Sequence, residues 1–214
     1  MAARMMVEVW RGPLAESVHA GHAVVCDGTG EIVEAWGDPE AVILPRSSAK
    51  MIQALPLVAS GAADAFSLST ERLALSCASH EGAPVHNAAV REWLADIGRS
   101  ENDLICGPQP SRDKDLWLGM IRDGQEPGRV LNNCSGKHTG FLTLTRHLGA
   151  GADYCDPDHP VQRACLSAFE EVTEMESPGF GIDGCSAPNF ATSMAGMARA
   201  MAFYATASQR GDLL

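Results

Sequence analysis

Residues 22–36 have the sequence HAVVCDGTGEIVEAW, in which two apolar runs, 22–26 and 32–36, flank the turn DGTGE. Asp and Gly readily adopt the backbone conformations of tight turns, so this pattern predicts a β-hairpin. Upstream, residues 6–11 alternate like a strand, and residues 41–44 form another short apolar run that ends at Pro45. The N-terminal part of the chain is therefore predicted to be β-structure.

Downstream of this region the apolar spacing changes to the three- and four-residue period of helices. Predicted helices begin near Ser47, Ser69 and Pro160, and others lie within residues 84–97, 132–148 and 192–206. Strands precede helices without βαβ alternation, which predicts an α+β fold with an antiparallel sheet flanked by helices. Because so few strands are recognisable, we expect this sheet to be incomplete at its C-terminal side.

The composition predicts a folded globular protein, with 45% hydrophobic and 20% charged residues in a chain of 214. That length suits a single domain over residues 1–214. The net charge of −11 argues against nucleic acid or an anionic membrane as partner. No apolar run approaches the ~20 residues of a spanning helix. The N-terminus lacks an export signal, and seven scattered cysteines indicate reduced thiols, so we expect a cytoplasmic protein.

Lysine is scarce, since only Lys50, Lys114 and Lys137 are found among 16 basic residues. A buried lysine can lose its proton and act as a base, whereas arginine cannot. In the segment RSSAK, Ser47 and Lys50 are spaced so that both lie on one face of a helix, where a neutral lysine can activate a serine hydroxyl. The alternative is a helix-capping serine beside a solvated lysine.

Three further segments carry reactive side chains. In CASHEG, Ser79 precedes His80 and Glu81, although neighbours in sequence rarely form a triad and ordinary helix-end residues give the same pattern. In NNCSGKH, Cys134 and Lys137 could face a metal or a substrate. The phosphate-loop pattern is not satisfied there, so no nucleotide cofactor is expected.

The last of these segments, DGCSAPN, contains Asp183 and Cys185 in a turn punctuated by Gly and Pro. Cys134 and Cys185 could supply two soft ligands to one zinc ion. Two cysteines alone are too few for a zinc site, and lysine is an unusual ligand. The residues by themselves therefore do not decide whether the protein binds a metal ion.

Together, the segments RSSAKMIQALP, CASHEGAPVH, NNCSGKHTGFL and GIDGCSAPNFA resemble the L-asparaginase II family in order and spacing. The similarity runs from about Val7 to about Tyr204. It implies a fold like that of serine β-lactamases and penicillin-binding proteins. It also implies hydrolysis of L-asparagine to L-aspartate and ammonia through an acyl-enzyme, and it suggests a homodimer.

The resemblance also implies roles for individual residues. It assigns catalysis to Ser47, Lys50 and Ser79, zinc binding to Cys134, Lys137 and Cys185, and substrate binding to Arg46, His138 and Asp183, with Asp183 holding the α-amino group. Which of the two serines is acylated stays open. Zinc is expected to orient the substrate rather than to activate water.

The chain departs from the family in one respect, because family members are longer. The lysine that partners the second serine lies in their C-terminal part, so no residue here takes that role. We therefore expect either a fragment or a truncated paralogue. Two other functions remain open: a non-catalytic protein that binds asparagine or zinc, and a related acyl hydrolase that acts on β-lactam-like amides.

Overall fold

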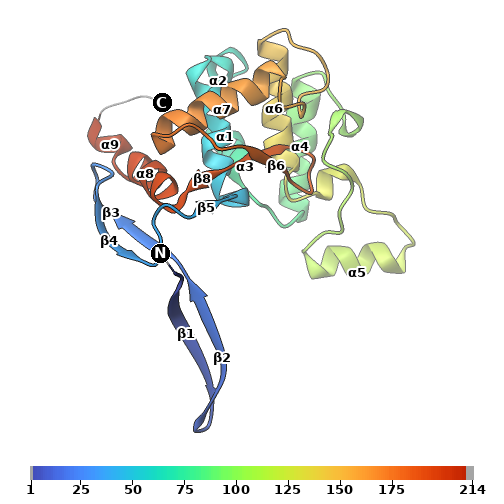
Figure 1. The fold of residues 1–214 in the computed structure, drawn as a ribbon. Helices are drawn as coiled ribbons and strands as arrows, with labels where there is room; N and C mark the ends of the chain where they lie inside the picture. Colours follow the sequence, from blue (N-terminus) through green and yellow to red (C-terminus); the bar gives the residue numbers. More distant parts are fainter. Residues whose placement is uncertain (1, 211–214) are drawn as a thin grey trace. The chain divides into compact units, whose positions relative to one another are not determined.

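The N-terminal residues form two antiparallel hairpins in the computed structural model, which describes residues 2–210 (Figure 1). Strand β1 (Arg4–Arg11) pairs with β2 (Leu14–Gly21), and β3 (Ala23–Cys26) pairs with β4 (Ile32–Trp36). The hairpin predicted for residues 22–36 is confirmed. Its turn is held by the Asp27 carboxylate, which accepts hydrogen bonds from the backbone N–H groups of Thr29 and Glu31 at 2.8 and 3.2 Å.

The described chain divides into two compact units. The first comprises residues 2–45, 170–179 and 190–210. Besides the two hairpins it contains β5 (Val42–Ile43) paired with β8 (Thr192–Ser193), then α8 (Met194–Ala205) and α9 (Ala207–Arg210). Helix α8 packs on β3, and the Ser193 side chain caps its first turn.

The second unit comprises residues 46–169 and 180–189 and is mainly helical. Its elements, some of which end just outside it, are η1 (Arg46–Ala49), α1 (Lys50–Ala59), α2 (Ala62–Ala65), α3 (Thr70–Cys77), α4 (Pro84–Asp96), η2 (Glu101–Asp103), α5 (Lys114–Arg122), η3 (Arg129–Leu131), α6 (Ser135–His147), α7 (Pro160–Thr173), β6 (Phe180–Ile182) and β7 (Pro188–Phe190). Strands β6 and β7 pair with one another.

Helix α6 lies at the centre of this unit, with α1, α2, α3 and α4 packed against it. Every residue from Ser135 to Thr145 is buried. The hydroxyls of Thr139, Thr143 and Thr145 donate to the carbonyl oxygens four residues earlier, at 2.7–2.8 Å. These bonds give the buried threonine hydroxyls hydrogen-bond partners within the helix. The N-terminal residues of α6 therefore belong to the buried part of the helix.

The α+β class predicted from the sequence is confirmed, with small two-stranded sheets among residues 2–210. The β-lactamase-like arrangement and the single domain remain predictions. The latter includes Met1 and residues 211–214, which lie outside the described residues. Between residues 2 and 210, no helix has both the length and the apolar character needed to cross a membrane.

Candidate active site

Three of the four motif segments line one cavity of about 300 Å³ in the second unit. This volume is at the lower end of the range for small-molecule sites. Of the residues singled out in the sequence, seven line it: Arg46, Ser47, Lys50, Cys134, Lys137, Asp183 and Cys185. The remaining lining residues are Gln53, Gln109, Arg112, Asn132, Asn133 and Gly184.

Ser47 lies in the 3₁₀-helix η1, directly before α1, rather than in the first turn of an α-helix as predicted. In a 3₁₀-helix, side chains three residues apart lie above one another, so Ser47 and Lys50 still share a face. The turn begins at Arg46, whose φ of 53° is uncommon for a residue other than glycine. Ser47 is exposed, and no hydrogen bond joins its hydroxyl to Lys50 or to any other described residue.

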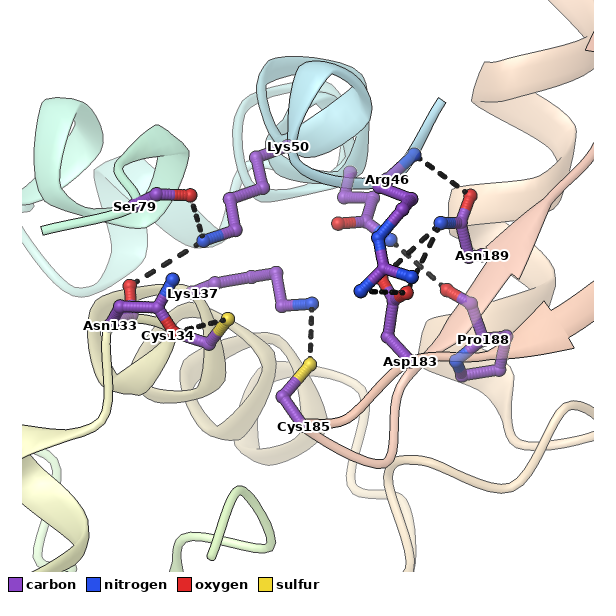
Figure 2. Close-up of polar contacts among 11 residues, drawn as sticks. Arg46, Lys50, Ser79, Asn133, Cys134, Lys137, Asp183, Cys185, Pro188 and Asn189 are labelled. Atoms are coloured by element: carbon purple, nitrogen blue, oxygen red, sulfur yellow. Dashed lines mark hydrogen bonds and ion pairs between the residues drawn. The ribbon is translucent and has the colours of Figure 1, made fainter. Parts of the chain in front are cut away.

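Lys50 instead contacts the second serine, Ser79, which follows α3 (Figure 2). Its Nζ lies 2.8 Å from Ser79 Oγ, donates to the Ala78 carbonyl at 2.8 Å and lies 3.5 Å from the Asn133 carbonyl. Only 2% of the residue is exposed, and this burial lowers the pKa of Lys50. Nζ is the donor in all three contacts, which hold the amine beside the Ser79 hydroxyl.

The predicted metal ligands also meet in the structure. Cys134 directly precedes α6, Lys137 lies in its first turn, and Cys185 lies in the turn between β6 and β7 (Figure 2). Lys137 Nζ is 3.3 Å from Cys185 Sγ. Hydrogen bonding between the two thiols raises the pKa of Cys134 and lowers that of Cys185. Among residues 2–210, no group of three or more His, Cys, Asp or Glu side chains is placed to hold a metal ion. The metal-binding role of Cys134, Lys137 and Cys185 therefore remains a prediction.

Asp183 is held at the cavity by two neighbours that lie in the same view (Figure 2). Arg46 forms an ion pair with its carboxylate at 3.6 Å. Asn189 donates from Nδ2 to both carboxylate oxygens at 3.3 Å, and its Oδ1 accepts from the Arg46 backbone N–H at 3.3 Å. Asn189 is only 3% exposed. Asn189 therefore holds both the Asp183 carboxylate and Arg46, the first residue of η1.

His138 does not line the cavity. It is fully buried, its Nδ1 lies 2.9 Å from the Tyr154 hydroxyl, and its ring packs edge-on against Tyr154 and Phe141. Burial lowers the pKa of His138 to about 4, so the ring is neutral at pH 7. Within the described residues its buried Nε2 makes no hydrogen bond. The substrate-binding role suggested for His138 therefore remains a prediction.

Sequence reasoning missed several residues of the site. Gln53, on α1, donates from Nε2 to the Pro188 carbonyl at 3.2 Å and so ties the helix to β7. Arg112 and Gln109 reach the cavity from the segment before α5. No motif marks this segment. Asn189 stands within a quoted motif, but an amide side chain on a short strand carries no chemical signal of its own.

A family model with the description L-asparaginase II matches residues 7–213. The comparison with curated proteins gives no match. The matched region includes every residue of the cavity described above.

Proposed function

The chain belongs to the L-asparaginase II family, which indicates an asparaginase-type hydrolase, and on this premise we propose that it converts L-asparagine to L-aspartate and ammonia by serine–lysine catalysis. The observation that carries the proposal is Lys50, a buried amine with a lowered pKa that shares a face with Ser47 and contacts Ser79. A neutral amine in this position is suited to act as a general base.

In the proposed reaction Ser47 is the nucleophile, because it lines the cavity and Ser79 does not. Ser47 Oγ attacks the carbon of the side-chain amide while its proton passes to Lys50 Nζ. The C–N bond then breaks, and ammonia leaves with a proton delivered from Lys50 through Ser79. Water next attacks the resulting ester, which releases L-aspartate and restores the Ser47 hydroxyl.

The cavity's charges suit the two ends of the substrate and the oxyanion. Asp183 carries the negative charge needed for the α-ammonium group, with Arg46 and Asn189 holding its orientation. Lys50 becomes positively charged when it takes the proton of Ser47, so it supplies positive potential at the cavity as the amide oxygen becomes negative.

We also propose a zinc ion held by Cys134, Lys137 and Cys185. Two thiols and an amine gathered at one cavity wall fit a soft cation, and a thiol with a lowered pKa, as at Cys185, is ready to bind one. When bound, zinc supplies positive charge that orients the substrate. The serine and lysine residues carry the chemistry.

The test combines an ammonia assay with intact-mass spectrometry of the chain during turnover of L-asparagine. Replacement of Ser47 by alanine should abolish both the aspartyl adduct and ammonia release, whereas Ser79→Ala should slow turnover and retain the adduct. Ser48→Ala is the matched control, because Ser48 is exposed nearby but does not line the cavity. An adduct on the Ser47→Ala chain would refute the assignment of the nucleophile.

Two other outcomes would identify the alternative functions. Calorimetric binding of L-asparagine without ammonia release indicates a non-catalytic binding protein. Labelling by penicillin in place of asparagine turnover indicates a hydrolase of β-lactam-like amides.

A homodimer and a cytoplasmic location complete the proposal. Both come from the sequence, the first by family resemblance and the second from the scattered cysteines, which are typical of a protein in a reducing compartment. Light scattering of the purified chain tests the dimer, and fractionation of the source cells tests the location.

A further inference from the structure

The cavity carries more positive charge than its own residues use. Two guanidinium groups line it, those of Arg46 and Arg112, beside the amines of Lys50 and Lys137 and against the single carboxylate of Asp183. Free L-asparagine is a zwitterion with an ammonium and a carboxylate on its α-carbon. Asp183 suits the ammonium, so the substrate's carboxylate needs one of the cations.

Three of these four basic side chains already have partners. Arg46 pairs with Asp183 at 3.6 Å, Lys50 lies 2.8 Å from Ser79 Oγ, and Lys137 lies 3.3 Å from Cys185 Sγ. The Arg112 guanidinium, in contrast, makes no ion pair or hydrogen bond with residues 2–210. It is the cation at the cavity that is left free for a ligand.

The backbone that carries Arg112 is firmly anchored beside the catalytic segment. Its N–H donates to the Glu81 carbonyl at 2.8 Å. The neighbouring Ser111 is buried, and its hydroxyl lies 3.2 Å from the Glu81 carbonyl and 3.0 Å from that of Gly82. These bonds attach the backbone of Arg112 to Glu81 and Gly82, which follow Ser79 by two and three residues. An anchored backbone reduces the conformational entropy that the Arg112 side chain loses when its guanidinium binds a ligand.

We propose that Arg112 binds the α-carboxylate of the substrate and thereby restricts the enzyme to free amino acids. Guanidinium binds carboxylate through two parallel N–H···O bonds, which selects for a planar, charged group. An asparagine inside a peptide has an amide in place of this carboxylate, so it leaves Arg112 unpaired. The inference rests on the proposed function, because it names the substrate class for the same cavity.

The test uses three amides that differ in one group each: L-asparagine, succinamate, which lacks the α-amino group, and 3-aminopropanamide, which lacks the α-carboxylate. Replacement of Arg112 by glutamine should raise KM about 10- to 100-fold for the two carboxylates. It should leave kcat/KM for 3-aminopropanamide within about twofold of its low wild-type value. Arg112→Lys should recover part of the lost affinity, because lysine restores the positive charge but not the two parallel N–H donors of guanidinium.

Arg122→Gln is the matched control, since it removes the same charge from an exposed position on α5 that does not line the cavity. An equal loss for all three amides, or no loss for L-asparagine, would overturn the role of Arg112.

A binding measurement separates this inference from the proposed function. If the wild-type chain releases no ammonia from L-asparagine, hydrolysis is refuted, but calorimetry with L-aspartate and β-alanine still tests Arg112. Tighter binding of L-aspartate, lost on Arg112→Gln and kept on Arg122→Gln, supports the inference. Equal affinity of both ligands for the wild-type chain, or binding of neither, overturns it.

Discussion

Acidification should destabilise the protein through His80. This residue is 4% exposed, its Nδ1 accepts from the Gly82 backbone N–H at 3.1 Å, and its Nε2 lies 2.9 Å from Ser135 Oγ. Protonation of Nδ1 places its N–H opposite the Gly82 N–H, so the hydrogen bond between these two groups is lost. Burial lowers the pKa of His80 from 6.5 to about 4, with the nearby His86 and Lys50 adding to the effect.

The sign and size of the effect follow from linkage. The folded state binds a proton at His80 more weakly than the unfolded state, so the stability from this residue is present above pH 6.5 and is lost as pH falls toward 4. At about 1.4 kcal/mol per pKa unit, the full difference is about 3 kcal/mol. Of this, about 2 kcal/mol is lost between about pH 7 and pH 5.

Urea unfolding at these two pH values measures the difference. His80→Asn is the matched variant, because its amide oxygen can accept from the Gly82 N–H and does not titrate in this range. The loss of unfolding free energy between the two pH values should be about 2 kcal/mol smaller in the variant. Equal losses in both proteins would refute the claim that a neutral His80 is required.

Three more predictions concern single substitutions. Replacement of Lys50 by methionine should reduce kcat for L-asparagine at least about 10³-fold while circular dichroism shows a folded chain, and a smaller loss would exclude Lys50 as the base. Asn189→Leu should free the Asp183 carboxylate and raise KM about tenfold for L-asparagine but not for succinamate, and equal effects on both would point to a general distortion. Gly82→Ala should lower the unfolding free energy by about 2–3 kcal/mol in urea titrations, because φ is +68° there and a Cβ would lie 2.6 Å from the Leu131 carbonyl oxygen; an unchanged midpoint would contradict this.

Elements with a strong local signal were predictable from the sequence. The Asp27 turn, the Ser69 cap of α3 and the start of α7 at Pro160 are all found as expected. In each case a few adjacent residues determine the geometry, through a side-chain hydrogen bond or the fixed φ of proline.

Elements without such a signal were missed. Strand β2 has almost every residue exposed, so burial imposes no alternation on its sequence. Helix α5 was also missed, although Asp113 does cap it by accepting from the Leu116 N–H at 3.0 Å.

The sequence predicts which residues belong to the site but not which of them contact one another. The motifs and the family resemblance identified Ser47, Lys50 and Ser79, yet Lys50 contacts Ser79, which is 29 positions away in the sequence. Such a contact depends on how α1 and α3 pack, and the spacing of residues within one helix carries no information about it. The same holds for Arg112, which approaches the cavity from a segment with no motif.

The burial of α6 has a consequence for how the site moves. Segments with many buried contacts and protected amides open least often in the native state. Cys134 and Lys137 belong to the beginning of such a segment, whereas Asp183 and Cys185 sit on a short turn whose Ser186 has a φ of 70°. The α6 side of the pocket is therefore expected to keep its position when a molecule enters, so that Lys137 meets every ligand from the same place.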